Sequence, residues 1–423
     1  MSQQYTVPFG EGHLPFSVPV GWDIDVAPGV GQPSEMASSW QFEPPPGLQA
    51  AVTEAQRIVI VFTDATRQSP DEQLAHSILQ FLQSVGFDLA QVSFLCAVGM
   101  HRPSTLAEKR QKLGPDIVER FTVDDHDPAE AITVGAIGGQ PVMVNARLME
   151  AGTLVIALGV VEPHQYAGYS GGAKTVVIGC GGADTIAATH SPRFLKHVGT
   201  CLGRVQGNPF QAFVRQAGAL IGLQWVYNVV LDTDGQIIAG KGGSPAAVHD
   251  QLVAEARAVY EVSVTAGYDV VVAGVGAPKD ANLYQASRAL TYIGLSQQPV
   301  IRPGGVIILP VPISEGVGQG IAEQNFMAAL QRYTDLRKLV ADMDADGCQP
   351  GEQRAYMLAR VLARHRVIVV GAQDIAAVRA AHLAPVDDIA EAFDLARVWC
   401  GTIHYAPRLL IVPHALQTLP IPV

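Results

Sequence analysis

Short, continuous apolar segments recur along the chain, and polar or amphipathic stretches separate them. In the first half, the segments at 57–62, 91–98 and 153–161 are rich in β-branched residues. Such runs are typical of strands that are buried on both faces of a parallel sheet. The stretch 71–85 is amphipathic and is preceded by Pro70, which predicts a helix. The order strand, polar loop, helix, strand predicts a parallel α/β sheet.

The same rhythm returns in the second half of the chain. Apolar segments at 268–275, 305–310 and 366–370 predict further strands, with amphipathic helices between them. We therefore predict two Rossmann-like α/β domains, one over residues 1–262 and one over 263–423. The active site is expected in the crevice between them, because α/β proteins bind ligands at the carboxyl ends of their strands.

Composition narrows the class of protein. The 423 residues are 48% hydrophobic and 16% charged, which excludes a mostly disordered chain. The net charge of −11 leaves no basic footprint for nucleic acid. The apolar runs are shorter than the roughly 20 residues that a membrane-spanning helix needs, so we expect no membrane partner. The first residues lack a signal-peptide pattern, and the five cysteines form no CxxC pair, so we expect a cytoplasmic protein with reduced thiols.

Three predicted strands end in side chains that are suited to chemistry. Asp64 and Arg67 follow the first strand, and an arginine fork matches two oxygens of a carboxylate or a phosphate. A helix-capping aspartate with a surface arginine is the structural alternative. His101 and His164 follow two other strands in similar positions. One such histidine by itself is more often structural, but two in one crevice favour acid/base catalysis.

A glycine-rich loop at 167–174 ends in Lys174 and nearly matches the phosphate loop GxxxxGK[ST], with Ala173 in place of the last glycine. A phosphate loop must open directly into a helix, whose N-terminus binds the phosphate. The β-branched, glycine-rich stretch 175–182 is a poor first helical turn, which disfavours a nucleotide triphosphatase. A lysine held in a tight glycine loop suits a nucleophile or a covalent anchor.

Two further groups of residues carry candidate chemistry. His190 follows a helical stretch and is either a helix-end histidine that favours the helix dipole or a metal ligand. In the second half of the chain, Tyr284, Gln285 and Arg288 lie on one predicted helix. Because Gln285 and Arg288 are three positions apart, they share a helix face.

Five motifs occur in a characteristic order: DATR at 64–67, GMHRP at 99–103, EPHQYAGYSGGAK at 162–174, THS at 189–191 and PKDANLYQA at 278–286. With these motifs, over most of its length, the chain resembles the lactate racemase family, whose members use a nickel-pincer nucleotide cofactor. The third motif, followed by His190, is the most specific part of the resemblance.

The resemblance implies the roles of the cofactor residues. Lys174 would bind the nickel-pincer nucleotide covalently, and His190 would be the protein's ligand to Ni(II), a metal that suits a roughly planar site. Asp64 would support and orient the site, and Arg67 would hold the cofactor phosphate or the substrate carboxylate. Because synthesis of the cofactor needs other proteins, we expect protein made in a host that lacks them to be the apoprotein.

The resemblance also implies racemisation or epimerisation of a 2-hydroxy acid by hydride transfer, with His101 and His164 as the two acid/base residues. Racemisation at a hydroxyl-bearing carbon requires a base on each side of that carbon, because the two enantiomers place their hydroxyls on different sides when the carboxylate is fixed. Tyr284, Gln285 and Arg288 would contact the substrate.

Two departures from the lactate enzyme affect the expected substrate. Arg288 stands where the lactate enzyme has lysine, and Gln353, with Tyr356 nearby, stands near a tryptophan position. Both changes favour a larger or more polar substrate than lactate, so a sugar acid or a dicarboxylic hydroxy acid is the alternative within the family. A nucleotide- or nickel-binding protein without catalysis is the alternative of another class, although such a carrier needs neither histidine.

Overall fold

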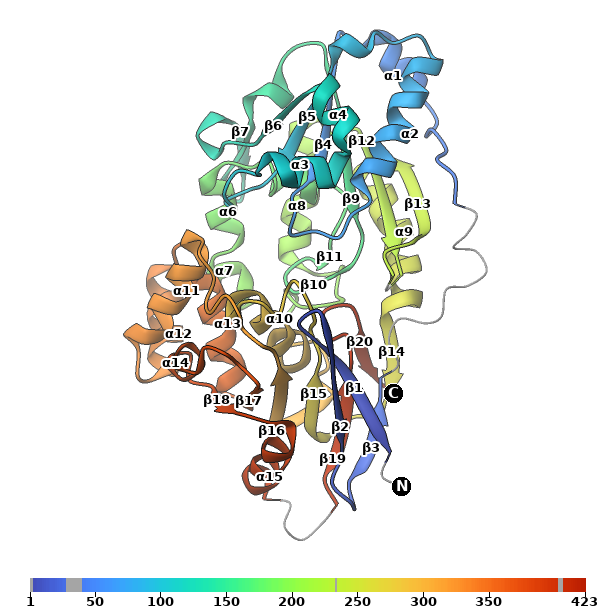
Figure 1. Ribbon diagram of the computed structural model, residues 1–423. Helices are drawn as coiled ribbons and strands as arrows, with labels where there is room; N and C mark the ends of the chain where they lie inside the picture. Colours follow the sequence, from blue (N-terminus) through green and yellow to red (C-terminus); the bar gives the residue numbers. More distant parts are fainter. Residues whose placement is uncertain (1–2, 28–39, 233, 402–405) are drawn as a thin grey trace. The chain divides into compact units, whose positions relative to one another are not determined.

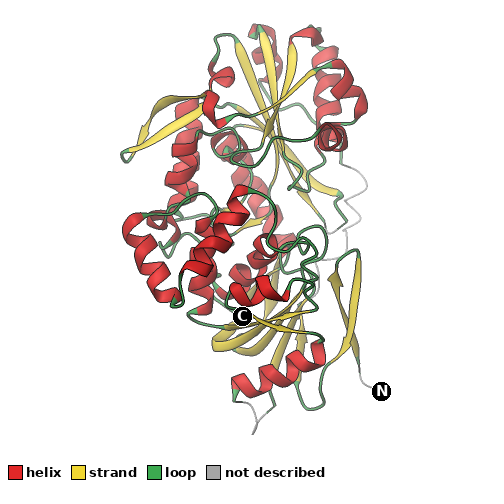
Figure 2. Ribbon diagram, turned by 60° about the vertical axis from the view of Figure 1, so that its left-hand side comes forward, coloured by secondary structure: helices red, strands yellow, loops and turns green. Residues whose placement is uncertain are grey.

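The computed structural model describes residues 3–27, 40–232, 234–401 and 406–423. The chain divides into two compact units, which are described separately. Unit 1 comprises residues 1–30, 191–204 and 260–423, and unit 2 comprises residues 31–190 and 205–259. Figures 1 and 2 show that each unit contains a sheet with helices packed beside it.

Unit 2 is built on a six-stranded sheet with the strand order β13-β12-β9-β4-β5-β6. All neighbouring strands are parallel except β13, which forms an antiparallel pair with β12. The strands are β4 (Arg57–Thr63), β5 (Val92–Ala97), β6 (Thr122–Asp125), β9 (Thr153–Val160), β12 (Trp225–Leu231) and β13 (Ile237–Gly243). In register, Thr63 lies opposite Ala97 and Val61 lies opposite Ala157. The carboxyl ends of β4, β5 and β9 therefore meet at one edge of the sheet.

The helices of unit 2 connect and cover these strands. They are α1 (Leu48–Glu54), α2 (Asp71–Ser84), α3 (Leu106–Leu113), α4 (Pro115–Arg120), α5 (Lys174–Val177), α6 (Ala183–Thr189), α8 (Pro209–Ile221) and α9 (Pro245–Tyr260). Two hairpins complete the unit: β7 (Ala131–Ile137) with β8 (Gln140–Asn145), and β10 (Pro163–His164) with β11 (Gly168–Tyr169). The apolar positions of β4 and α2 pack into one core, which includes Ile58, Ile60, Phe62, Leu74 and Ile78. This packing explains the alternation of apolar and amphipathic segments along the chain.

Unit 1 contains a second six-stranded sheet, with the order β18-β17-β16-β15-β19-β3 and every pair parallel. Its strands are β3 (Asp23–Val26), β15 (Tyr268–Ala273), β16 (Ile301–Pro310), β17 (Arg366–Val370), β18 (Ala384–Val386) and β19 (Arg408–Val412). Its helices are α7 (Pro192–Leu195), α10 (Leu283–Gly294), α11 (Ile321–Arg332), α12 (Leu336–Asp346), α13 (Glu352–Leu362), α14 (Ile375–Ala380) and α15 (Ile389–Cys400). An antiparallel hairpin of β1 (Gln4–Phe9) and β2 (Gly12–Ser17) and a parallel pair of β14 (Glu261–Val264) and β20 (Leu419–Pro422) also belong to it.

The structure confirms the predicted α/β class with parallel sheets. The units differ, however, from the predicted contiguous division into 1–262 and 263–423. β3 pairs with β19, so the N-terminal segment extends the sheet of unit 1. The segment 191–204 also belongs to unit 1, because α7 packs against α12 and α13. Among the described residues, no helix is both long enough and apolar enough to cross a membrane.

Candidate active site

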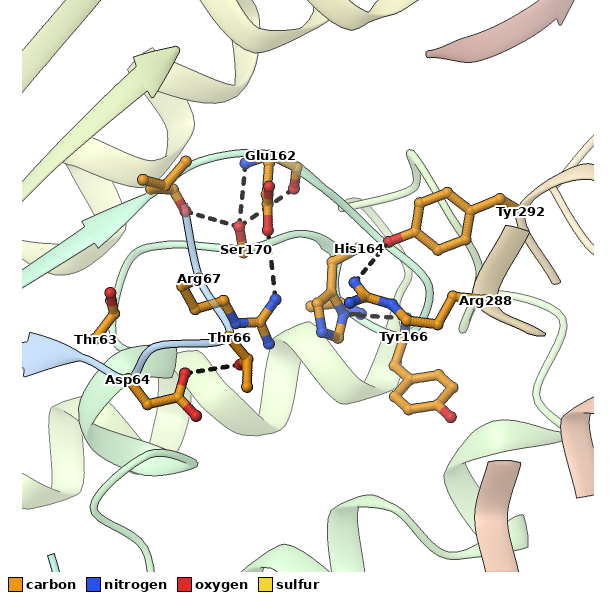
Figure 3. A network of polar contacts seen from close by, with 12 residues as sticks. Thr63, Asp64, Thr66, Arg67, Glu162, His164, Tyr166, Ser170, Arg288 and Tyr292 are labelled. Atoms are coloured by element: carbon orange, nitrogen blue, oxygen red, sulfur yellow. Dashed lines mark hydrogen bonds and ion pairs between the residues drawn. The ribbon is translucent and has the colours of Figure 1, made fainter. Parts of the chain in front are cut away.

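In unit 2, the polar motifs that follow β4, β5 and β9 lie at the same edge of the sheet. Parallel register brings the ends of these strands together, and each strand is followed by a loop that carries predicted site residues. Figure 3 shows Asp64 and Arg67 from the first loop and Glu162 and His164 from the third. The structure therefore groups residues that are about a hundred positions apart in the sequence.

Asp64 and His101 form a hydrogen-bonded pair. Oδ2 of Asp64 lies 2.6 Å from Nδ1 of His101, and the Asp64 side chain is 9% exposed whereas that of His101 is 48% exposed. Burial by itself would raise the pKa of Asp64, but the hydrogen bond and charge of His101, together with the charge of Arg67, lower it below its ordinary value. An ionised Asp64 accepts the Nδ1–H of His101, so Nε2 carries the lone pair of the neutral ring. Such a ring is oriented to accept a proton at Nε2.

His164 is held in the opposite way. Its side chain is buried, and Nδ1 accepts hydrogen bonds from the backbone N–H groups of Tyr166 at 3.2 Å and Ala167 at 3.1 Å. Because both donors point at Nδ1, the proton of the neutral ring resides on Nε2. The short β10–β11 hairpin, in which His164 pairs with Gly168, creates this geometry. The two histidines thus present Nε2 in different states: a proton acceptor on His101 and a proton carrier on His164.

Arg67 and Ser170 tie the same edge together. Nη1 of Arg67 lies 3.4 Å from Oε1 of Glu162, an ion pair that Figure 3 shows. The hydroxyl of Ser170 donates to the carbonyl of Val160 at 2.7 Å and accepts from the backbone N–H of Glu162 at 3.1 Å. The glycine-rich loop is therefore fastened to the end of β9, next to Arg67.

The glycine-rich loop has a conformation and a packing that require glycine. Gly171 and Gly172 have φ angles of +90° and +58°, which L side chains rarely adopt. A Cβ on Gly171 would lie 2.6 Å from a methyl of Val161, and one on Gly172 would lie 3.1 Å from Cβ of His249. The loop leads into α5, a four-residue helix that begins at Lys174. The β-branched residues after Lys174 therefore do form a first helical turn, which the sequence disfavoured, but the helix ends at Val177.

His190 lies at the end of α6, half-buried against two aromatic rings. Its Nδ1 is 3.0 Å from the carbonyl of Ile186, to which it donates, and this bond places the lone pair of the neutral ring on Nε2. The rings of Tyr166 and Phe210 meet the imidazole edge-on, with centroids 5.5 and 5.4 Å away. His164 also packs against both rings, at 5.8 and 6.3 Å. The structure therefore joins His164 and His190 through one aromatic cluster.

Phe210 and Asn208 are members of this site that sequence reasoning missed. Asn208 caps α8 and donates from its side-chain amide to the carbonyl of Tyr166 at 2.7 Å. Phe210 follows in the first turn of α8 and is fully buried. The sequence does contain a recognisable N-cap, Asn208-Pro209, but nothing in it indicates that this helix start meets the histidines.

Three of the predicted substrate residues, Tyr284, Gln285 and Arg288, lie on α10 of unit 1. Arg67, the fourth, lies in unit 2 with the predicted catalytic and cofactor residues. Nη2 of the buried Arg288 donates to the hydroxyl of Tyr292, 3.2 Å away. The guanidinium of Arg354, on α13, lies 4.9 Å from the ring centre of Tyr284, and sequence reasoning missed this second buried arginine. Gln285 is half-buried in the first turn of α10, and its backbone N–H donates to the capping Asn282.

Gln353 occupies a local structural role at the start of α13. Its side-chain oxygen accepts a 2.6 Å hydrogen bond from the backbone N–H of Gly351. The nearby Tyr356 donates its hydroxyl to Asp344 at 3.0 Å and is buried. These contacts are within unit 1, and the substrate contact expected of Gln353 stays a prediction.

The donor set around His190 fits a metal that brings its own ligands. Within the described ranges, three or more metal-binding side chains come together only at the surface cluster of Glu72, His76 and Asp116. His190 is not part of that cluster, so it would offer a metal one imidazole rather than a complete ligand set. An imidazole whose Nδ1–H is bound to a carbonyl is a normal ligand for nickel. The site therefore suits a metal-containing cofactor better than a bare ion.

Comparison with known proteins identifies the class and the family. The N-terminal and C-terminal domain models of lactate racemase match residues 44–203 and 263–417. Lactate racemase of Thermoanaerobacterium thermosaccharolyticum is 27% identical over 377 residues, which cover 88% of this chain and 86% of that protein. Lactate racemase of Lactiplantibacillus plantarum is 30% identical over 331 residues, 76% of each chain.

Two solved structures share the fold. The lactate racemase apoprotein of T. thermosaccharolyticum has a TM-score of 0.85 at 24% identity and covers 99% of this chain and 100% of its own. A Thermotoga maritima protein has a TM-score of 0.69 at 19% identity and covers 93% and 100%. The fold and the sequence relatives together define an α/β enzyme of the isomerase class, a racemase. More particularly, the chain belongs to the lactate racemase family.

Proposed function

We propose that this enzyme racemises or epimerises a 2-hydroxy acid and that it uses a nickel-pincer nucleotide bound covalently at Lys174. The observation that carries the proposal is the opposite arrangement of the two histidines in unit 2. Nδ1 of His101 faces a carboxylate, and Nδ1 of His164 faces two backbone N–H groups. One ring is thereby prepared to accept a proton and the other carries one on Nε2, which is what inversion at a hydroxyl-bearing carbon requires at any moment.

In the proposed mechanism, Nε2 of His101 accepts the substrate's hydroxyl proton. Asp64 stabilises the imidazolium that forms, because its buried carboxylate already binds Nδ1–H. His164 holds a proton at Nε2 toward the position that the substrate's hydroxyl oxygen occupies in the other enantiomer. A carrier that only stored the cofactor would need no buried carboxylate behind a histidine, so this pair favours catalysis over storage.

Residues of unit 2 would hold the cofactor. Lys174 follows a loop whose backbone is held by Ser170 and by the bond from Gly172 N–H to the side chain of Asn228, 2.7 Å long. His190 would supply the protein's ligand to Ni(II) through Nε2. When bound, such a cofactor supplies reversible acceptance of the α-hydrogen as hydride. Loading depends on cofactor-synthesis proteins, which we include among the proposed partners.

Arg67, Tyr284, Gln285 and Arg288 are the proposed contacts for the substrate carboxylate and side chain. Arg67 also remains a candidate for the cofactor phosphate, because a guanidinium fork matches two oxygens of a phosphate as well as those of a carboxylate. Arg288 offers a rigid two-pronged donor where lysine offers a point charge. This difference favours a 2-hydroxy acid that is more polar than lactate, with sugar acids and dicarboxylic hydroxy acids as the specific candidates.

The experiment is a stereochemical assay of cofactor-loaded protein on single enantiomers of lactate and of longer, branched, dicarboxylic and sugar-derived 2-hydroxy acids. Chiral chromatography follows the appearance of the other enantiomer or epimer. We expect at least one polar acid to be converted with a higher kcat/KM than lactate, and Arg288→Lys to shift the ratio toward lactate. A preference for lactate over every analogue would refute the specificity, and loaded protein that converts none of the acids would refute the proposed function.

A further inference from the structure

A buried ammonium lies behind the loop that carries Asp64 and Arg67. Lys112, on α3, has a side chain only 9% exposed, and its Nζ lies 2.6 Å from Oδ2 of Asp71, whose side chain is fully buried. The same ammonium lies 3.0 Å from the hydroxyl of Thr63 and 3.1 and 3.2 Å from the carbonyls of Arg67 and Ser69. Four oxygens of the loop and its two ends therefore surround one positive charge.

Asp71 closes this network from the other side. Its Oδ2 accepts from the Thr63 hydroxyl at 2.6 Å, and its Oδ1 accepts from the Ser69 hydroxyl at 2.9 Å. Thr63 is the last residue of β4, and Asp71 is the first residue of α2. The strand end, the helix start and the intervening backbone thus converge on the ion pair between Lys112 and Asp71.

The network contacts the part of the loop that carries Asp64 and Arg67. The loop has no regular secondary structure between β4 and α2, so its path depends on such side-chain contacts. A turn, in which Arg67 N–H donates to the carbonyl of Asp64, separates the two proposed site residues. Because Lys112 binds the carbonyl of Arg67, it holds the end of this turn directly.

We propose that Lys112, paired with Asp71, is a positioning residue of this enzyme: its ammonium sets the path of the 64–69 loop, which brings Asp64 onto Nδ1 of His101. The relevance to catalysis rests on the proposed function, whereas the effect on the loop does not. A buried ion pair is a poor source of stability, since apolar groups of similar volume often replace one without loss. An ammonium nevertheless offers directed hydrogen bonds to carbonyls, which an apolar side chain cannot.

The chain offers a matched control on the same helix. Nζ of Lys109 lies 2.8 Å from Oδ2 of Asp125 and 3.1 Å from the carbonyl of Val123, and both charged side chains are less than one-sixth exposed, at 15% and 12%. This second pair joins α3 to β6, away from the 64–69 loop. Neutralising it removes a comparable ion pair on the same helix without removing one of the hydrogen bonds that Lys112 and Asp71 make to the loop.

The test compares Lys112→Met/Asp71→Asn with Lys109→Met/Asp125→Asn. The asparagine introduced at position 71 keeps one acceptor oxygen, for the hydroxyl of Thr63 or of Ser69, and its amide N–H can donate to the other hydroxyl oxygen. The first variant therefore mainly loses the bonds from the ammonium. In the apoprotein, long-range ¹H–¹⁵N NMR of the His101 ring, assigned with His101→Gln, reports which nitrogen carries the proton. We expect the Nδ1–H form in the wild type and in the control, and a mixture of tautomers with faster amide exchange at 64–69 in the first variant.

In loaded enzyme, kcat should fall by about tenfold or more in the first variant only, since small misplacements of catalytic groups cost this much.

Each outcome decides the proposal. An unchanged His101 tautomer and unchanged exchange at 64–69 in a folded Lys112→Met/Asp71→Asn would overturn it, as would equal effects in the control. If that variant does not fold, Lys112→Arg decides: it keeps the charge but cannot direct a compact ammonium at the carbonyls, so an unaltered His101 signal there would overturn the proposal as well. If the His101 tautomer shifts in the apoprotein of the first variant, the loop proposal stands. If, in addition, neither the loaded wild type nor any loaded variant racemises a substrate, the proposed function is refuted.

Discussion

Acid should destabilise unit 2 through His249, a fully buried histidine that packs behind the glycine-rich loop. Its Nδ1 accepts from Nη2 of Arg215 at 3.1 Å, and its Nε2–H points at the carbonyl of Tyr169, 3.4 Å away. Burial, reinforced by the positive charge of Arg215, lowers the pKa of His249 from 6.5 to about 4. A proton on Nδ1 would break the bond from Arg215 and place two positive charges together.

The magnitude follows from the difference between the two pKa values. His249 takes up its proton near pH 6.5 in the unfolded chain but only near pH 4 in the folded protein. The unfolded state therefore binds more protons between these values, and the contribution to stability is complete above pH 6.5 and is lost as the pH falls to about 4. At about 1.4 kcal/mol per pKa unit, the loss is about 3 kcal/mol.

Urea unfolding between pH 4.5 and 7.5 measures this effect. His249→Gln cannot titrate but keeps a donor toward Tyr169. We therefore expect its free energy of unfolding to depend less steeply on pH than that of the wild type. Over this pH range the variant should lose less stability than the wild type, and the difference should be most of the loss of about 3 kcal/mol given above. Part of the slope should remain, because burial also lowers the pKa of His126 and His365. The exposed His13 provides the control His13→Gln, which should follow the wild type. Equal slopes for the wild type and His249→Gln would refute the reasoning.

Three further predictions concern the proposed cofactor and catalysis. Under loading conditions, intact mass spectrometry should show the wild type heavier than Lys174→Ala by the cofactor mass, and equal masses would contradict covalent attachment at this residue. His190→Ala should retain less nickel and show weaker visible absorption, whereas full nickel content with an unchanged spectrum would make His190 structural. His101→Ala and His164→Ala should each lose about 100-fold in turnover in both directions, the usual scale for a missing general base. Near-normal racemisation by either would remove that histidine from the mechanism.

Local sequence patterns determine the fold class and most candidate residues. Runs of β-branched residues such as those of β4 and β9 bury both faces of a strand, and this requirement is visible without knowledge of the partners. The candidate site residues are also visible in local patterns: Asp64, His101 and Lys174 each lie within or just after a compact motif at a strand end. Carboxyl ends of parallel strands meet at one edge, so their shared location in unit 2 follows from the fold class alone.

Tertiary structure decides the properties that depend on partners distant in sequence. Whether a histidine accepts or carries a proton depends on what meets Nδ1, and His101 meets a carboxylate 37 positions away. Lys112 has no motif, and only the packing of α3 against the β4–α2 connection brings its ammonium to the carbonyls of Arg67 and Ser69. Unit 1 likewise combines segments from both ends of the sequence, because β3 pairs with β19, near the other end of the chain. Side-chain periodicity records which face of an element is buried but not which element covers it, so these pairings arise only when the chain folds.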